Sequence, residues 1–219
     1  MTNELELFER IEQELYVPVI SDSLDSLGYR NCAMSPRVRP LRENFVVAGR
    51  ARTALWMYVY APDPEPYVVE IEFMDKLKPG DVVVTNSDLP LKNAPWGELM
   101  STAAKMRGAR GAIIDSCVRD VKKIFAIDFP VFASGISPLD SSGRGKVVSY
   151  DVPVECGDVH VEPGDLVDGD YDGVVVIPKK VEKQALDLAF SKVAKENQTR
   201  KELMDGKTLR EVYDKYGVL

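Results

Sequence analysis

Histidine and cysteine are scarce in this 219-residue sequence, and their scarcity excludes several kinds of catalytic site. His160 is the single histidine and lies in an alternating pattern typical of a strand. A Ser-His-Asp or Cys-His arrangement would have to use it, yet no nucleophile with a positioned third group is visible around it. Cys32, Cys117 and Cys156 are far apart and form no CxxC pair, so we expect buried thiols rather than a disulfide framework or a zinc site.

Long apolar runs and excess positive charge are also missing. No apolar run reaches the roughly 20 residues that span a bilayer, and the acidic amino terminus, MTNELELFER, is unlike a signal peptide. We therefore expect a cytoplasmic protein without a membrane partner. The formal net charge of -7 disfavours a broad phosphate-binding surface, so nucleic acid is not an expected partner either.

The composition is that of a folded protein, with 45% apolar and 29% charged residues. The length favours one large domain, residues 1–219, whose C-terminal part from about 180 is a helical extension. Near the amino terminus, helical spacing predicts a helix over 3–16 that ends at Val17-Pro18. Ser21 suits the N-cap of a second short helix, which Gly28 closes.

Strands and helices alternate closely in the middle of the chain, as in an α/β unit. The patterns predict, in order, extended strands at 45–60, a helix at 67–77, a strand at 81–85, a loop at 86–96, a helix at 97–106, a strand at 111–115, a strand and turn at 129–135, and β-rich sequence at 146–178.

Arg119 and Asp120 come just beyond the carboxyl end of the strand GAIID, where ligands of open α/β sheets gather. A helix that starts near Gly97 presents unpaired backbone N–H groups and the positive end of its dipole, which suits a carboxylate ligand. Arg119 adds a planar fork for the same carboxylate, and Asp120 is a hard oxygen ligand for a magnesium-like ion. The pattern indicates a small metal-assisted carboxylate site, with a solvated surface ion pair as the alternative.

Several longer motifs make the chain resemble a known family. The run WGELMSTAAKMRGARGAIIDSCVRD, the upstream ISDSLDSLG, and the downstream FPVFASGISPLDSSGRG, VEPGDLVDGDYDGVVVIP and LREVYDKYGVL occur in family order. They resemble the family that joins 4-hydroxy-4-methyl-2-oxoglutarate aldolases with the regulator of ribonuclease activity A. The resemblance implies a layered α/β/β sandwich of the swivelling-domain type. It also implies a homotrimer, or a homohexamer of two trimers, with active sites at subunit boundaries.

The resemblance assigns roles to individual residues. Gly97, Glu98, Leu99 and Met100 correspond to the loop whose backbone binds the substrate carboxylate or keto oxygen, Arg119 to the substrate-binding arginine, and Asp120 to the ligand of a divalent metal cation, Mg or Mn. The implied activity is the cleavage of a 4-hydroxy-2-oxoacid to pyruvate, with oxaloacetate decarboxylation as a side activity. The general base is left open between a metal-bound water and an acidic residue of a neighbouring subunit.

Two departures from the family pattern affect the expected substrate. Lys123 stands where the aldolase pattern has an acidic residue, and Ser116-Cys117 stand where the family usually shows glycine. A cation at 123 could weaken a water-filled metal shell or recognise a second substrate charge. Which 4-hydroxy-2-oxoacid is cleaved therefore stays open.

Other motifs have plainer interpretations. DGDYDG, 168–173, lacks the final glutamate of a calcium loop and is better read as an acidic turn between strands. SGRGK, 142–146, lacks the spacing of a phosphate-binding loop. The aromatic cluster at 56–67 favours core packing or a subunit contact. Trp96 is open between lining the site and acting as a hydrophobic staple for the helix that follows.

Two rival functions come from other classes. One branch of the family is a non-catalytic regulator that binds ribonuclease or helicase partners, and such a branch need not keep the metal ligand Asp120. A quinone methyltransferase is disfavoured, because no glycine-rich loop for a methyl donor follows an early strand.

Overall fold

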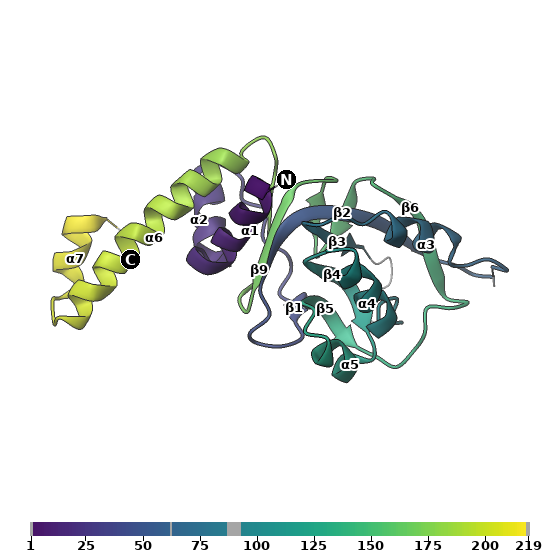
Figure 1. Ribbon diagram of the computed structural model, residues 1–219. Coiled ribbons are helices and arrows are strands. Elements are labelled where there is room, and N and C mark those ends of the chain that lie inside the picture. Colours follow the sequence, from purple (N-terminus) through teal and green to yellow (C-terminus); the bar gives the residue numbers. More distant parts are fainter. Residues whose placement is uncertain (1, 62, 87–92, 218–219) are drawn as a thin grey trace.

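The computed structural model describes residues 2–61, 63–86 and 93–217, and Figure 1 shows its arrangement. Within these residues, eight strands form one mixed sheet in the order β1-β5-β4-β3-β2-β9-β10, with β6 pairing on β2. The strands are β1 (Arg39–Pro40), β2 (Val47–Tyr58), β3 (Asp81–Thr85), β4 (Gly111–Val118), β5 (Val131–Ile136), β6 (Gly145–Tyr150), β9 (Leu166–Asp170) and β10 (Gly173–Ile177).

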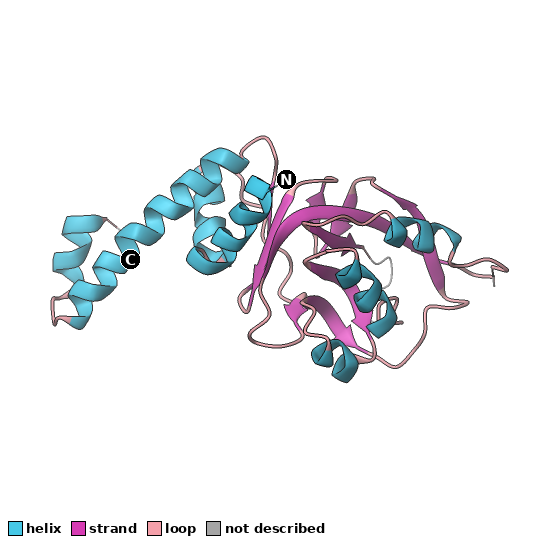
Figure 2. Ribbon diagram, viewed as in Figure 1, coloured by secondary structure: helices cyan, strands magenta, loops and turns pink. Residues whose placement is uncertain are grey.

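Helices and a small hairpin surround the sheet (Figure 2). The helices are α1 (Thr2–Glu14), α2 (Val17–Ser26), α3 (Val68–Asp75), α4 (Glu98–Met106), α5 (Val121–Ala126), α6 (Glu182–Met204) and α7 (Leu209–Tyr216). The hairpin pairs β7 (Val154–Cys156) with β8 (Val159–Val161).

The two faces of the sheet bury different partners because side chains alternate along each strand. Ile114 faces a core that contains Phe73 of α3, Ala104 of α4 and Ile124 of α5. Ile113, one residue earlier, faces a second core that contains the hairpin. The layers are therefore helix, sheet and hairpin, which confirms the expected α/β/β sandwich.

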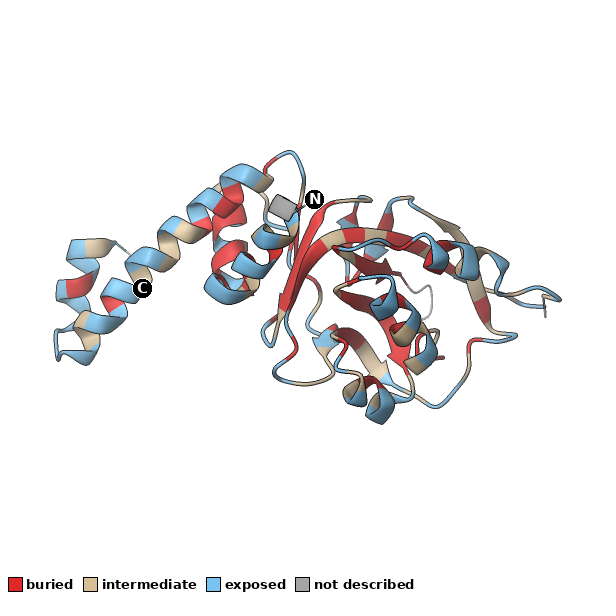
Figure 3. Cartoon of the chain, viewed as in Figure 1, coloured by how far each residue is buried: buried red, intermediate tan, exposed pale blue. Residues whose placement is uncertain are grey.

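A third core joins α1, α2 and the first half of α6 to β9 and β10. Beyond it, α6 continues away from the sheet and α7 folds back on its end, so these helices form an arm (Figure 1). The strands are buried along most of their length, whereas the arm is largely exposed (Figure 3). No helix in the described ranges is long and apolar enough to cross a membrane.

The parallel strands β2, β3, β4 and β5 set up the candidate site, because their carboxyl ends lie at one edge of the sheet. Most predicted elements are present, including the helix that Gly28 closes with a φ of +86°. The predicted loop at 86–96 lies partly outside the described residues, since 87–92 are not described.

Two predictions near the ends of elements were wrong, and one short helix was missed. Ser21 is not an N-cap but lies inside α2, which begins at Val17 and holds Pro18 in its first turn, where a missing N–H costs nothing. The strand predicted at 111–115 continues to Val118 past a register irregularity between Ile114 and Cys117. The six-residue helix α5 was not predicted.

Candidate active site

The end of β4 and the start of α4 are tied together by the backbone. All eight residues of β4 are buried, so the strand is fixed between β3 and β5 until it ends at Val118. The backbone N–H of Arg119, the next residue, donates to the carbonyl oxygen of Trp96 at 2.9 Å. Trp96 directly precedes Gly97, the N-cap of α4. The predicted arginine and the predicted helix start are therefore neighbours.

Gly97 is packed against the Arg119-Asp120 pair. Its φ of -153° and ψ of -164° are extended angles that any residue adopts. A Cβ at this position, however, would lie 2.9 Å from Asp120 Oδ2 and 3.2 Å from Arg119 Cγ. An alanine here would have to displace the Asp120 carboxylate, so glycine is favoured by close approach rather than by backbone conformation.

Asp120 occupies an unusual backbone conformation. Its φ of 58° and ψ of 30° are left-handed, a region that Asp and Asn tolerate better than most residues. Asp120 is the N-cap residue of α5, yet its side chain makes no cap hydrogen bond, and 45% of that side chain is exposed. The carboxylate is thus available to a ligand, and backbone strain of this kind gathers at functional sites.

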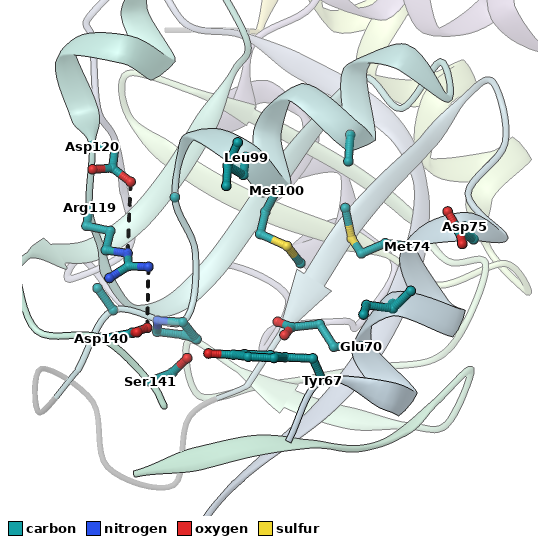
Figure 4. Close-up of a pocket in the computed structure, with 15 residues that line it drawn as sticks. Tyr67, Glu70, Met74, Asp75, Leu99, Met100, Arg119, Asp120, Asp140 and Ser141 are labelled. Atoms are coloured by element: carbon teal, nitrogen blue, oxygen red, sulfur yellow. Dashed lines mark ion pairs between the residues drawn. The ribbon is translucent and has the colours of Figure 1, made fainter. Parts of the chain in front are cut away.

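A cavity of about 380 Å³ lies between α3, α4 and the end of β4 (Figure 4). Of the residues predicted for the site, it is lined by Gly97, Leu99, Met100, Arg119 and Asp120. Residues that were not predicted complete its wall, among them Tyr67, Glu70, Ile71, Met74, Asp75, Ala103 and Asp140.

Glu98 is the one predicted site residue that is not among the lining residues. Its side chain accepts a hydrogen bond from Thr102 Oγ1 at 3.0 Å, one turn along α4. Its backbone nonetheless belongs to the first turn of α4, which has no side-chain cap hydrogen bond.

Arg119 is held between two carboxylates in the cavity wall (Figure 4). Its Nη2 lies 3.4 Å from Asp140 Oδ1, and its Nε lies 3.9 Å from Asp120 Oδ2. Sequence reasoning missed Asp140, because the loop after β5 gives no pattern that distinguishes one polar residue from another. The pair with Asp140 orients the guanidinium while 39% of the arginine side chain stays exposed.

Glu70 is the second acidic residue that sequence reasoning missed. It lies on α3 and points into the cavity from the wall opposite Arg119 (Figure 4). Burial, with the nearby charge of Asp140 as a second cause, raises the pKa of Glu70 to about 7. Perturbed acids in a cavity are common at catalytic sites.

The other highlighted residues lie outside this cavity. Lys123 is exposed on α5, and His160 is exposed on β8 beside Glu162. Trp96 is buried and its Nε1 donates to Ser101 Oγ at 2.8 Å, which anchors it to α4. All three cysteines are buried and free, as predicted.

Two other predictions concern turns and aromatic packing. The predicted acidic turn is confirmed by the β9–β10 pair, in which the Asp172 N–H donates to Asp170 Oδ1. In the aromatic cluster, Trp56 packs in the core and Tyr67 lines the cavity.

The residues around the cavity can be tested against a divalent cation. Among the described residues, no group of three or more His, Cys, Asp or Glu side chains converges as a ligand set. Mg²⁺ in substrate-dependent sites usually binds one or two carboxylates and completes its shell with waters and substrate oxygens. The uncapped carboxylate of Asp120, in a cavity wide enough for a small ligand, fits this pattern.

Comparison with known proteins decides the family. The model of RraA-like proteins, described as "Aldolase/RraA", matches residues 17–176. The chain belongs to the RraA-like family. A "Putative 4-hydroxy-4-methyl-2-oxoglutarate aldolase" of Halalkalibacterium halodurans is 34% identical to this RraA-like chain over 186 residues, which cover 85% of this chain and 83% of the relative.

Solved structures with different functional names share the fold. A Streptomyces coelicolor member of the "RNase ES inhibitor RraA protein family" has a TM-score of 0.82 and 27% identity, with 90% of this chain and 98% of that chain covered. A Geobacillus kaustophilus protein named "S-adenosylmethionine: 2-dimethylmenaquinone methyltransferase" has a TM-score of 0.60 and 28% identity, with 74% and 96% covered. The relatives carry three different functional names, so the reaction has to be argued from the site.

Proposed function

We propose that this RraA-like protein is a divalent-metal-dependent lyase. It cleaves a 4-hydroxy-2-oxoacid, such as 4-hydroxy-4-methyl-2-oxoglutarate, to pyruvate and decarboxylates oxaloacetate as a side reaction. The observation that carries the proposal is the cavity in which the first turn of α4, Arg119 and Asp120 meet. The aldolase name of the Halalkalibacterium halodurans relative supports it.

The carboxylate of the substrate binds at the start of α4. The N–H groups of Glu98, Leu99 and Met100 are the first of the helix, and no side chain caps them. The helix dipole favours an anion at this end, and the Arg119 guanidinium adds charge-assisted hydrogen bonds. Asp140 keeps Arg119 directed at this place.

A divalent cation, magnesium or manganese, would be held by Asp120 and would supply Lewis-acid polarisation of the 2-keto oxygen. Arg119 and the α4 amides act on the same end of the substrate, where negative charge grows as the carbon–carbon bond breaks. Met74 and Met100 form an apolar part of the cavity wall, which suits the carbon chain of the substrate.

We further propose that a neighbouring subunit covers the mouth of the cavity, in a homotrimer or in a homohexamer of two trimers. Two large apolar side chains that line the cavity are exposed, Leu99 at 77% and Ile71 at 59%. Exposed apolar patches of this kind mark interaction surfaces. Light scattering should give three or six times the chain mass of 24.4 kDa, and a monomer would contradict this part of the proposal.

Pyruvate formation tests the proposed reaction. The protein is treated with a chelator and then assayed with oxaloacetate and with 4-hydroxy-4-methyl-2-oxoglutarate, with and without added Mg²⁺ or Mn²⁺. Metal-restored pyruvate from either substrate supports the lyase. If neither gives pyruvate, the non-catalytic regulator becomes the better account, in line with the ribonuclease-inhibitor name of the Streptomyces coelicolor relative.

A further inference from the structure

Glu70 is set apart from the other acidic residues of α3 by its position. Glu72 is exposed and pairs with Lys76 and Tyr150, and Asp75 at the edge of the cavity pairs with Arg107. The Glu70 side chain instead points into the cavity (Figure 4). Its neighbours in the wall include Tyr67, the N-cap residue of α3, and Met100 from α4.

No cation neutralises Glu70 among the described residues, where its carboxylate has neither an ion pair nor a hydrogen bond. The charged groups that share the cavity are Arg119, Asp120, Asp140 and Asp75. Arg119 is already paired with Asp140, so the Glu70 carboxylate stays uncommitted. Because burial and Asp140 raise the pKa of Glu70 to about 7, both protonation states are populated near neutral pH.

We propose that Glu70 is the proton-transfer residue of this cavity. The inference rests on the proposed lyase function and deepens it. In cleavage, the Glu70 carboxylate takes the proton of the substrate's 4-hydroxyl group, the C3–C4 electron pair moves into the pyruvate enolate, and the C4–O bond becomes a carbonyl. The Glu70 carboxylic acid then returns this proton to C3 of the enolate, which gives pyruvate and leaves Glu70 ionised again.

Two reactions with small substrates separate this role from the rest of the site. Exchange of the pyruvate methyl protons with D₂O, followed by proton NMR, requires a group that removes a proton from C3. Oxaloacetate decarboxylation makes the same enolate by losing carbon dioxide and requires no base. Both assays are run on the full chain with Mg²⁺ or Mn²⁺ present.

Glu70→Gln should lower pyruvate exchange about 100-fold or more, a typical contribution of a general base, and should leave oxaloacetate consumption within about threefold. Wild-type exchange should rise with pH through about 7, and the residual exchange of the variant should lack this rise. Glu70→Asp keeps a carboxylate and should recover part of the rate. Glu72→Gln, on the same helix but outside the cavity, is the matched control and should change neither reaction.

Each other outcome overturns the role of Glu70. Exchange that is equal in wild type and Glu70→Gln means that another group moves the proton. An equal loss of both reactions in Glu70→Gln means that the residue supports binding or folding instead. If wild type decarboxylates oxaloacetate but does not exchange the pyruvate protons, the role of Glu70 is wrong and the lyase function stands. If wild type is active in neither assay, the role of Glu70 and the lyase function are both wrong.

Discussion

A methyl group on Gly97 would lie 2.9 Å from Asp120 Oδ2, which is closer than side-chain carbons normally approach an oxygen. The N-cap of α4 and the carboxylate after β4 are therefore fitted to each other, although 22 residues separate them. This contact places the anion-binding end of the helix beside the proposed metal ligand.

Gly97→Ala should consequently displace the Asp120 carboxylate. Because the extended backbone at position 97 accepts alanine, the melting temperature should change little. Pyruvate formation should fall about 10- to 100-fold, since misplacing a reacting group by about 1 Å costs this much. Steady-state kinetics and a melting curve on the same preparation check both parts, and full activity would show that the close packing is unimportant.

The Arg37-Asp115 pair holds the β7–β8 hairpin to the sheet. Asp115 on β4 is only 4% exposed and accepts from Arg37 Nη2 at 2.8 Å, and also from Ser134 Oγ and the Gly157 N–H. Burial alone would raise the pKa of Asp115, but these hydrogen bonds outweigh burial and hold the pKa below its usual value.

Arg37→Ala should lower the free energy of unfolding by about 2 to 4 kcal/mol at pH 7, because the buried Asp115 carboxylate loses its ion-pair partner. The loss is smaller than for a fully buried pair, since one third of the arginine side chain is exposed.

The pH dependence follows from the lowered pKa of Asp115. A lowered carboxyl pKa stabilises the fold above the unfolded pKa of about 4, and this contribution is lost as pH falls through the folded pKa. The difference from wild type should shrink below about pH 4. Arg210→Ala, which breaks an exposed pair with Asp214 on α7, is the control and should cost under about 0.5 kcal/mol. Urea unfolding at pH 7 and pH 3 makes the comparison, and equal losses in both variants would argue against it.

Asp168 on β9 is expected to reduce stability at neutral pH. It is buried, and burial, followed by the charges of Asp170 and Glu12, raises its pKa well above the usual value. The folded protein keeps the proton over a range in which the unfolded chain has lost it, so stability falls as pH rises above about 4. Asp168→Asn should therefore melt at least about 2 °C higher at pH 7 and show a smaller gain at pH 4. A lower melting temperature at pH 7 would contradict the assignment.

The Arg119-Asp120 half of the candidate site could be predicted from sequence because its signals are local. The apolar run before Arg119 marks a buried strand, and Gly97 precedes good helix formers. The carboxyl end of that strand and the start of that helix could therefore be placed at the same edge of the sheet. The same local reasoning failed for Ser21, where proline in the first helical turn is the stronger start signal. A six-residue helix such as α5 is too short to show a period.

Glu70 and Asp140 could not be predicted because their roles come from tertiary packing. The spacing at 67–77 predicts a helix, but acidic residues occur at 70, 72 and 75, and nothing local tells which one faces a cavity. That choice is made by how α3 packs against α4 and the sheet. Asp140 lies in a loop, where position is fixed by the parallel bridge between Ala94 and Asp140 rather than by any repeating pattern.

The central claim, that Asp120 serves metal-dependent carbon–carbon cleavage, is tested most directly by Asp120→Asn. Asparagine tolerates the left-handed backbone at this position and keeps the shape of the side chain, so the fold should be unchanged by circular dichroism and melting. The measurement is pyruvate formation from oxaloacetate by chelator-treated protein as Mg²⁺ or Mn²⁺ is added back. Wild type should regain activity with increasing metal while Asp120→Asn stays at the background rate. Equal recovery in both proteins would contradict the account.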